Sequence, residues 1–421
     1  MPLSVNRLGL CRTHVTAAAT AMLCFSCNYG EVVVVTPAAA GHGPLTISIQ
    51  ADPEDSTAAR ELGWSRGIPG AEVTVSPADA DTAAAPPVAV LRTDSAGAAR
   101  VPDLPDGHYL VEVRRLLASA EAAQLAPTED VIGFMANTVV ERGSDTVLTP
   151  ASHRRSIVIS EWAFNTGSGP GISMYYFGGY LELANNSDTT VYLDGLVIGE
   201  AYSVAWEYKP GGCAGSEGAT NDPDGVWTQH FDSLPGTGHT YPLAPGATAV
   251  IATDAVDHTA IIPGGLDLSH ANFEFPGTAD ADNPSVPNAV DIGLVPYRFD
   301  HGLFLNNLLE EVTFVALPVD VAALPMTPGR EYVRVPRERI LDVIALLSVF
   351  DFNAPLCPHL VHRNFDRYRS RLMGMPNSIG FLHSIERKVA YTRADGRKIL
   401  QHTRTSNADF YFGPRTPGWL P

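Results

Sequence analysis

The sequence predicts a mainly β protein made of two consecutive β-sandwiches. Short segments in which apolar and polar residues alternate with period two recur along the chain, which is typical of strands with one buried face. The 421 residues include 37 Gly and 33 Pro, so turns are frequent. Hydrophobic residues make up 45% of the chain and charged residues 18%, which excludes a disordered or fibrous protein. The length suffices for two or three domains.

Charge is distributed unevenly along the chain. The net charge of −18 disfavours a nucleic-acid-binding protein and favours a well-solvated extracellular protein or one that meets cations. The stretch Arg363–Arg404 is nevertheless basic, with ten basic and three acidic residues. No stacking aromatic residues alternate with these cations as in a nucleic-acid-binding motif. We therefore expect them to form surface ion pairs with the acidic remainder of the chain.

The N-terminal residues predict export. Arg7 and Arg12 precede an apolar run at 15–25. This run has the length of the apolar region of a signal peptide and is too short to span a bilayer. The sequence therefore predicts an export signal and no membrane helix here.

The end of this run predicts lipidation. Ser26 and Cys27 resemble the lipobox of bacterial lipoproteins, although the three residues before the cysteine depart from the usual Leu, small residue, and Gly or Ala. The resemblance implies a signal peptide at 1–26, a lipid on Cys27 and a tether at 27–43. The protein would then contact the outer membrane or cell surface through its lipid anchor only. Ordinary signal-peptidase cleavage between residues 17 and 21 is the alternative.

Two cysteines, Cys213 and Cys357, remain once those of the first 27 residues are set aside. Both lie in Gly- or Pro-rich loops of a chain predicted to be exported, where disulfides form. We predict a disulfide between them, and two buried thiols are the alternative. No spacing of Cys and His suits zinc or thioredoxin-like redox chemistry.

Residues 44–150 predict the first β-sandwich. Alternating segments separated by turn residues lie at 45–50, 71–75, 88–91 and 109–113. A Pro-Gly-Ala before a strand, a Thr-Asp-x-x-Gly turn and a Leu-Pro-x-Gly-x-Tyr run follow in this order. In this respect the segment resembles the carboxypeptidase regulatory-like, transthyretin-type module. That resemblance implies a spacer or adhesive module, sometimes associated with carbohydrate, without catalysis. Residues 116–125 depart from the pattern and predict a helix.

After a polar linker at 150–154, residues 155–421 predict a larger β-sandwich with long loops. It contains an Ile-Ser-Glu strand at 159–161, a Tyr-Leu-Glu-Leu-Ala-Asn-Asn-Ser run at 180–187 and an Asp-Gly-Leu turn at 194–196. These motifs resemble the lamin-tail, immunoglobulin-like fold. Further motifs are Pro-Gly-Thr-Gly-His-Thr-Tyr-Pro-Leu-Ala-Pro-Gly at 235–246, Ala-Thr-Asp-Ala-Val-Asp-His-Thr at 252–259, Asp-Leu-Ser-His-Ala-Asn-Phe-Glu-Phe at 267–275 and Asp-Ala-Asp-Asn-Pro-Ser-Val-Pro-Asn at 280–288.

With these motifs the chain more closely resembles the domain-of-unknown-function family 4876, which occurs on surface lipoproteins of Bacteroidetes and similar bacteria. The resemblance covers nearly all of residues 155–421. Within this domain, residues 336–347 predict a short helix because a Pro at its first turn precedes apolar residues at helical spacing. Asp395 and Gly396 predict a hairpin turn.

Three aromatic residues, Trp206, Tyr208 and Trp227, flank the Gly-rich loop and are the predicted ligand contacts, because aromatic side chains in loops can stack on a sugar ring or planar ligand. Packing of that loop on itself is the alternative. An enzyme would instead bring carboxylates and imidazoles together in a pocket. The candidates for that arrangement are Glu182, Asp254, Asp257, His258, His270 and Glu274.

Neither a calcium loop nor a familiar catalytic motif occurs in the sequence. Oxygen ligands for Ca²⁺ occur at Asp280, Asp282 and Asn283 and at Asn221, Asp222 and Asp224, but without the spacing of a calcium loop. Bound Ca²⁺ stays open as an alternative, and no other cofactor is expected. The sequence contains no nucleophile elbow, phosphate loop, His-Glu-x-x-His or dinucleotide motif.

We therefore expect a non-enzymatic cell-surface lipoprotein that presents a ligand-binding domain on a spacer module. The expected ligand is a glycan or nutrient, and the expected protein partner is an outer-membrane receptor. The alternative is an accessory protein of a secreted or surface hydrolase or nuclease, in which the stretch Arg363–Arg404 would hold an anionic substrate.

Overall fold

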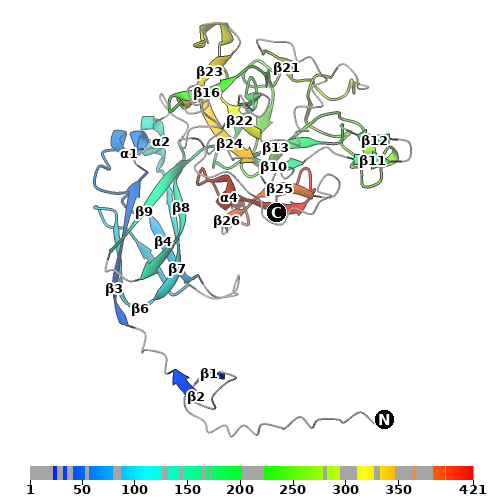
Figure 1. Cartoon of the computed structure of the whole chain (residues 1–421). Helices are drawn as coiled ribbons and strands as arrows, with labels where there is room; N and C mark the ends of the chain where they lie inside the picture. The colour runs from blue at the N-terminus through cyan, green and yellow to red at the C-terminus, as the bar shows by residue number, and fades with distance from the viewer. Residues whose placement is uncertain are drawn as a thin grey trace, which may run out of the picture.

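The computed structural model confirms a mainly β protein with several sheets, consistent with the β-sandwich class. Figure 1 shows a first β body, blue to cyan, beside a larger body that carries the green to red part of the chain. The structure describes residues 22–25, 32–35, 41–52, 56–78, 87–125, 131–142, 146–163, 167–169, 172–175, 177–201, 222–277, 282–293, 311–326, 332–346, 365, 383–393 and 395–420.

The first body contains a seven-stranded sheet. In spatial order its strands are β5 (Ala89–Arg92), β4 (Glu72–Pro77), β7 (Gly107–Leu116), β8 (Gly133–Arg142), β9 (Thr146–Arg154), β3 (His42–Ala51) and β6 (Ala98–Pro105). Neighbouring strands are antiparallel except for β3 and β9, which are parallel. The predicted strands at 45–50, 71–75, 88–91 and 109–113 are confirmed, whereas β6 was not predicted.

The apolar residues of these strands form one core. Leu45, Ile47 and Ile49 alternate with more exposed residues along β3, so one face of the strand is buried. Two short helices, α1 (Thr57–Glu61) and α2 (Ser119–Leu125), contact each other at one end of the sheet in Figure 1. The position of α2 confirms the helix predicted within residues 116–125.

The predicted linker at 150–154 is wrong. These residues lie in β9, which pairs with β3 as far as Ala151 and with β8 as far as Arg154. The prediction was based on side-chain polarity. Strand pairing uses backbone groups, which a polar segment offers equally well.

The larger body contains two sheets that enclose a common core. The six-stranded sheet has the order β20 (Phe273–Glu274), β19 (Thr248–Ala252), β13 (Tyr180–Asn185), β10 (Ile157–Ala163), β25 (His383–Arg387) and β28 (Phe410–Pro414). The five-stranded sheet has the order β21 (Val290–Asp291), β17 (Phe231–Ser233), β15 (Val197–Glu200), β22 (Glu311–Ala316) and β24 (Ile340–Leu346). The core includes Trp162, Leu181 and Ile385 of the first sheet and Ile198, Val315 and Ile344 of the second.

Short elements complete this body. Two-stranded pairs join β11 (Gly167–Gly169) with β12 (Ile172–Tyr175), β14 (Val191–Tyr192) with β18 (Pro242–Leu243), β16 (Gly225–Thr228) with β23 (Val333–Pro336), and β26 (Val389–Thr392) with β27 (Lys398–Leu400). The short helices are η3 (His258–Ala260), η5 (Val321–Ala323), η6 (Arg337–Arg339) and α4 (Ser406–Asp409). Gly396 has φ +84° in the turn between β26 and β27, which confirms the predicted hairpin.

The helix predicted at 336–347 is wrong. One short 3₁₀ turn, η6, is followed by the strand β24, which pairs with β22. From Ile340 to Ala345 every residue of β24 is buried, because both faces of the strand are covered. A strand buried on both faces has apolar residues at consecutive positions, and such a run also contains residues at helical spacing.

The two bodies touch through the segment around β26 and β27. The guanidinium carbon of Arg114 on β7 lies 4.3 Å from the ring centre of Tyr391 on β26. The backbone N of His402 donates to Sδ of Met135 on β8 at 3.1 Å. Figure 1 shows β26 and α4 beside β8 of the first sheet.

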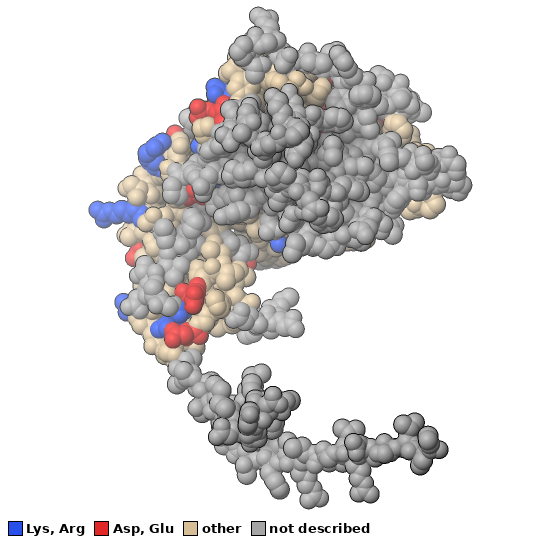
Figure 2. All heavy atoms as spheres, in the orientation of Figure 1, with Lys and Arg blue, Asp and Glu red and all other residues tan. Residues whose placement is uncertain are grey.

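Charges of both signs are interspersed on the first body. Figure 2 shows basic and acidic side chains next to one another along the described part of this face. Arg114 pairs with Glu72 at 3.1 Å, and Arg142 pairs with Asp106.

The described helices all lack the length and hydrophobicity needed to cross a membrane.

Two further strands precede the first body. β1 (Met22–Phe25) pairs antiparallel with β2 (Val32–Val35). Cys27, the predicted site of lipid attachment, lies outside the described residues.

Candidate functional site

An open cleft of about 1010 Å³ lies on the larger body beside the β26–β27 hairpin. Four segments form it: the turn after β13, the turn before β19, the hairpin itself and the segment that follows β28. The cleft is lined by Asp188, Pro245, Gly246, Ala247, Thr248, Arg393, Asp395, Gly396, Arg397, Lys398, Gly418, Trp419 and Leu420.

Trp419 is the aromatic residue of the cleft, and 76% of it is exposed. A turn presents it, in which its backbone N donates to the carbonyl of Thr416 at 3.0 Å and Gly418 has φ +85°. On its other side, Lys398 Nζ donates to the carbonyl of Leu420 at 2.9 Å. The indole is therefore held by its backbone while its ring remains available to a ligand.

Three charged side chains of the cleft pair with one another. Arg393 donates to Asp188 Oδ1 at 2.6 Å, and Arg397 donates to the same carboxylate. Partial burial raises the pKa of Asp188, but the hydrogen bonds from both arginines outweigh it and lower this pKa below its ordinary value. The cleft thus offers fixed carboxylate and guanidinium groups, which can hydrogen-bond vicinal hydroxyls beside an aromatic face.

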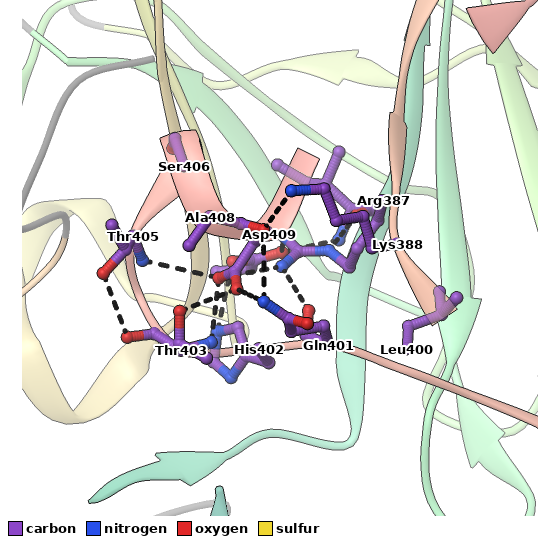
Figure 3. Close-up of polar contacts among 12 residues, drawn as sticks. Arg387, Lys388, Leu400, Gln401, His402, Thr403, Thr405, Ser406, Ala408 and Asp409 are labelled. Carbon is purple, nitrogen blue, oxygen red and sulfur yellow. Dashed lines mark hydrogen bonds and ion pairs between the residues drawn. The ribbon is translucent and has the colours of Figure 1, made fainter. Parts of the chain in front are cut away.

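A buried polar network holds the base of the hairpin (Figure 3). Arg387 of β25 donates to the carbonyl of Gln401 at 2.9 Å and pairs with Asp342 of β24, so it links the two sheets. Asp409 accepts from Thr403 N at 2.8 Å and from Thr403 Oγ1 at 2.7 Å. Burial raises the pKa of Asp342, but the charges of Arg387 and His402 together with hydrogen bonds from His402 and the backbone of Ile159 lower this pKa below its ordinary value.

Three buried glutamates form a row on the outer face of the six-stranded sheet. Glu161 of β10 lies directly opposite Glu182 of β13 and Glu386 of β25. Their exposed fractions are 1%, 0% and 3%. Burial raises the pKa of all three carboxyls, that of Glu182 to about 7. We call these three residues the glutamate row.

Each member of the glutamate row accepts hydrogen bonds. Glu161 Oε1 accepts from the hydroxyl of Tyr180 at 2.6 Å, and Glu386 Oε2 accepts from the hydroxyl of Tyr411 at 2.6 Å. Glu182 Oε1 accepts from Ser160 Oγ at 2.7 Å. The row also contacts the segment 415–420, which carries Trp419.

The aromatic residues predicted from the sequence lie elsewhere. Trp206 and Tyr208 are outside the described residues, as are Cys213 and Cys357. Trp227 is half-buried in β16, its Nε1 donates to Asp222 Oδ2 at 2.9 Å, and the guanidinium of Arg334 lies 6.0 Å from its ring centre. Its polar atom is therefore used within the chain, and Trp227 does not line the cleft.

The six residues considered for an enzyme do not share the cleft. His258 is fully buried; its Nδ1 lies 2.6 Å from the hydroxyl of Tyr175, and its Nε2 lies 2.9 Å from the carbonyl of Asp254. Burial lowers the pKa of His258 and raises that of Tyr175 to about 12. Glu274 accepts from Ala255 N at 3.0 Å, so these groups serve the packing of loops.

Two more members of that set are exposed. Asp257 caps η3 by accepting from Thr259 N at 2.9 Å, and His270 lies at the surface. Glu182 belongs to the glutamate row, apart from the segment 254–274 that carries the other five.

Three of the residues proposed as Ca²⁺ ligands, Asp222, Asp282 and Asn283, use side-chain oxygens within the chain, and Asp224 is exposed. Asp222 accepts from Asp224 N and from Trp227 Nε1. Asn283 accepts from Ser285 N, and Asp282 accepts from Asn288 Nδ2. Asn221 and Asp280 lie outside the described residues. Within the described ranges, no three His, Cys, Asp or Glu residues are grouped so that they could hold a metal ion.

Sequence reasoning missed Trp419, Glu161 and Glu386. Glu161 ends the Ile-Ser-Glu motif, and Glu386 occurs in a similar Ser-Ile-Glu run at 384–386. The repetition of a buried-strand pattern containing one Glu was a signal that could have linked them to Glu182. Trp419 follows Pro417-Gly418, a turn signal that could have predicted an exposed position.

Several described cations of the basic stretch form ion pairs within the chain, as predicted, but the pair of Arg387 with Asp342 is buried and does not lie at the surface. Arg387 is buried against Asp342, and Arg393 and Arg397 pair with Asp188. The cations from Arg363 to Arg371 lie outside the described residues.

Comparisons with known proteins identify a family without a known activity. Residues 244–316, which contain β19 to β22, match the model of the family described as Protein of unknown function (DUF4876). This match confirms the family resemblance inferred from the sequence for this segment of residues 155–421. A crystal structure of a DUF4876 family protein from Bacteroides thetaiotaomicron is 16% identical, with a TM-score of 0.49, and the match covers 90% of this chain and 95% of that chain. A search of curated proteins gave no match.

Proposed function

We propose that this chain, with its DUF4876 segment, is a non-enzymatic cell-surface lipoprotein that binds carbohydrate in the Trp419 cleft. The first β-sandwich would serve as a spacer between a lipid on Cys27 and the binding domain. Export and lipidation are supported by the sequence of residues 1–27 alone.

The observation that carries the proposal is the exposed indole of Trp419 within a concave, polar cleft. A large aromatic ring in water gains free energy when an apolar face covers it, and the face of a sugar ring is such a surface. The paired Arg393, Arg397 and Asp188 beside it suit hydroxyl groups, since with Asp395 and Lys398 the three cations and two carboxylates that line the cleft leave a formal charge of only +1. A neutral or weakly charged sugar is therefore the best-matched ligand.

The binding test uses the full chain on a glycan array, followed by calorimetric titration with the oligosaccharide that binds. We expect Trp419→Ala to weaken binding at least about tenfold, equivalent to about 1.4 kcal/mol, and to leave the melting temperature unchanged. Tyr192→Ala is the matched control, because Tyr192 is 41% exposed and lies outside the cleft. Equal binding by the Trp419 variant and the wild type would refute the assignment of the site.

Export and lipid anchoring are tested separately. Cys27→Ser should move the protein from the membrane pellet to the soluble exported fraction and remove the mass of the lipid. If the variant stays in the pellet with unchanged mass, the protein is not anchored through Cys27.

A further inference from the structure

The segment 415–420 is held by two buried carboxylates. Thr416 N donates to Glu161 Oε1 at 3.0 Å, and Thr416 Oγ1 lies 3.4 Å from Glu161 Oε2. Two residues further on, Gly418 N donates to Glu182 Oε2. The first two glutamates of the row therefore bind the backbone immediately before Trp419.

Outer contacts fix the ends of the same segment. Arg415 donates to the carbonyl of Gly264, and Lys398 Nζ donates to the carbonyl of Leu420. These contacts leave the turn in the middle, with Trp419, to be positioned by the glutamates.

Burying neighbouring carboxyl groups costs free energy of folding, which suggests that Glu161 and Glu182 have a specific role. Glu161 and Glu182 are opposite each other on adjacent strands, where apolar side chains would pack without desolvating charge. The third member of the row, Glu386, accepts from Tyr411 instead of from the segment. The row thus contains two residues that hold the segment and one that provides an internal comparison.

We infer that Glu161 and Glu182 are positioning residues of the Trp419 cleft, which hold the segment 415–420 through its backbone so that the indole faces the ligand. The inference rests on the proposed function of that cleft. Neither glutamate lines the cleft, so each acts through Trp419 and not by contact with the ligand.

Substitutions at Glu182 can separate acceptor, charge and length. Glu182→Gln keeps a side-chain oxygen that accepts from Gly418 N, while its NH₂ group can face Ser160. The hydroxyl of Ser160 can then donate to the backbone carbonyl of residue 182, which lies 3.2 Å away. Glu182→Leu removes the acceptor. Glu182→Asp shortens the side chain by one methylene and so moves the carboxylate away from Gly418 N. It replaces the Leu variant in the test if that variant does not fold. Glu386→Leu is the matched control from the same row.

Hydrogen exchange of the full chain, measured by mass spectrometry on a peptide containing residues 415–420, tests the inference without any ligand. We expect exchange of this peptide to accelerate at least tenfold in Glu182→Leu and severalfold in Glu182→Asp. The Gln variant should exchange like the wild type, and Glu386→Leu should not accelerate this peptide selectively. Equal acceleration in Glu182→Leu and Glu386→Leu, or none in Glu182→Leu, would overturn the inference.

Affinity for an oligosaccharide from the array gives the second readout. It should fall about tenfold in Glu182→Leu and be restored in Glu182→Gln, since the Gln variant keeps the acceptor. If no glycan binds the wild type, the proposed function fails while the exchange result still decides whether the glutamates hold the segment. If exchange changes as expected but affinity does not, the glutamates hold the segment without positioning the ligand site, and the inference is wrong.

Discussion

Glu161 and Glu182 face each other on the adjacent strands β10 and β13, both almost fully buried. Burial penalises the charged form of a carboxyl group and raises its pKa. For Glu182 the ordinary value of 4.5 rises to about 7, and burial is the largest cause, while hydrogen bonds from Ser160 and Gly418 oppose it. A raised pKa links the free energy of unfolding to pH.

The first prediction concerns this linkage. Between pH 4.5 and 7 the folded protein keeps a proton on Glu182 that the unfolded chain releases. The free energy of unfolding should therefore fall as pH rises through this window, by on the order of 3 kcal/mol. Glu161 and Glu386 add in the same direction because their pKa values are also raised.

Chemical denaturation at several pH values measures the effect. Glu182→Gln should flatten the slope, because Gln does not titrate. Exposed Glu338→Gln should retain the slope of the wild type. An unchanged slope in Glu182→Gln would show that Glu182 is not the titrating group.

The strands of the first body could be predicted because their signal is local. β3 and β7 bury one face, so apolar residues alternate along each. The hairpin at Asp395 and Gly396 is also specified by adjacent residues. In β24 burial of both faces removes the alternation, and the sequence of that strand does not distinguish it from a helix.

The candidate site could not be predicted because it depends on the pairing register of strands that are far apart in the sequence. Glu161 and Glu386 meet only when β10 and β25 pair with the register found here. Likewise, the environment of Trp419 comes from the hairpin and from the turn before β19, which are far apart in sequence. Trp227 was a plausible ligand contact from its position beside a Gly-rich loop, but Asp222 takes its Nε1.

The second prediction concerns the ion pair between the sheets. Arg387→Met should lower the free energy of unfolding by about 3 to 5 kcal/mol, since the guanidinium is lost and the imidazole of His402, 3.2 Å from Asp342, is left to face the buried carboxylate. Arg393→Met removes a partly exposed pair with Asp188 and should cost less than about 1 kcal/mol. Urea denaturation compares the two variants. Similar losses in the free energy of unfolding would contradict the distinction between the buried and the partly exposed ion pair.

The third prediction concerns Gly413, which lies opposite Ser384 beside the glutamate row. A Cβ at this position would overlap the carboxylate of Glu386. We expect Gly413→Ala to lower the free energy of unfolding by about 1 to 3 kcal/mol through overpacking. In a Glu386→Ala background the same substitution should cost much less, because the overlapping atoms are gone. A double-mutant cycle with no coupling would rule out this steric explanation.

The last prediction concerns the contact between the two bodies. Met135 of β8 is 3% exposed, and its Sδ accepts from His402 N beyond β27. Arg114 stacks on Tyr391 in the same region, so the first sheet and the hairpin support each other. We expect the wild type to unfold in one calorimetric transition, and Met135→Ala to cost about 2 to 5 kcal/mol and to split it into two.

Met135→Leu tests whether packing or the sulfur acceptor matters. Leu keeps nearly the same volume, a swap that usually costs less than about 1.5 kcal/mol. A single transition in the Leu variant would assign the coupling to packing, whereas a split transition would assign it to the hydrogen bond from His402. Two separate transitions in the wild type would show that the bodies unfold independently. In that case the contact at Met135 contributes to the stability of one body and not to their coupling.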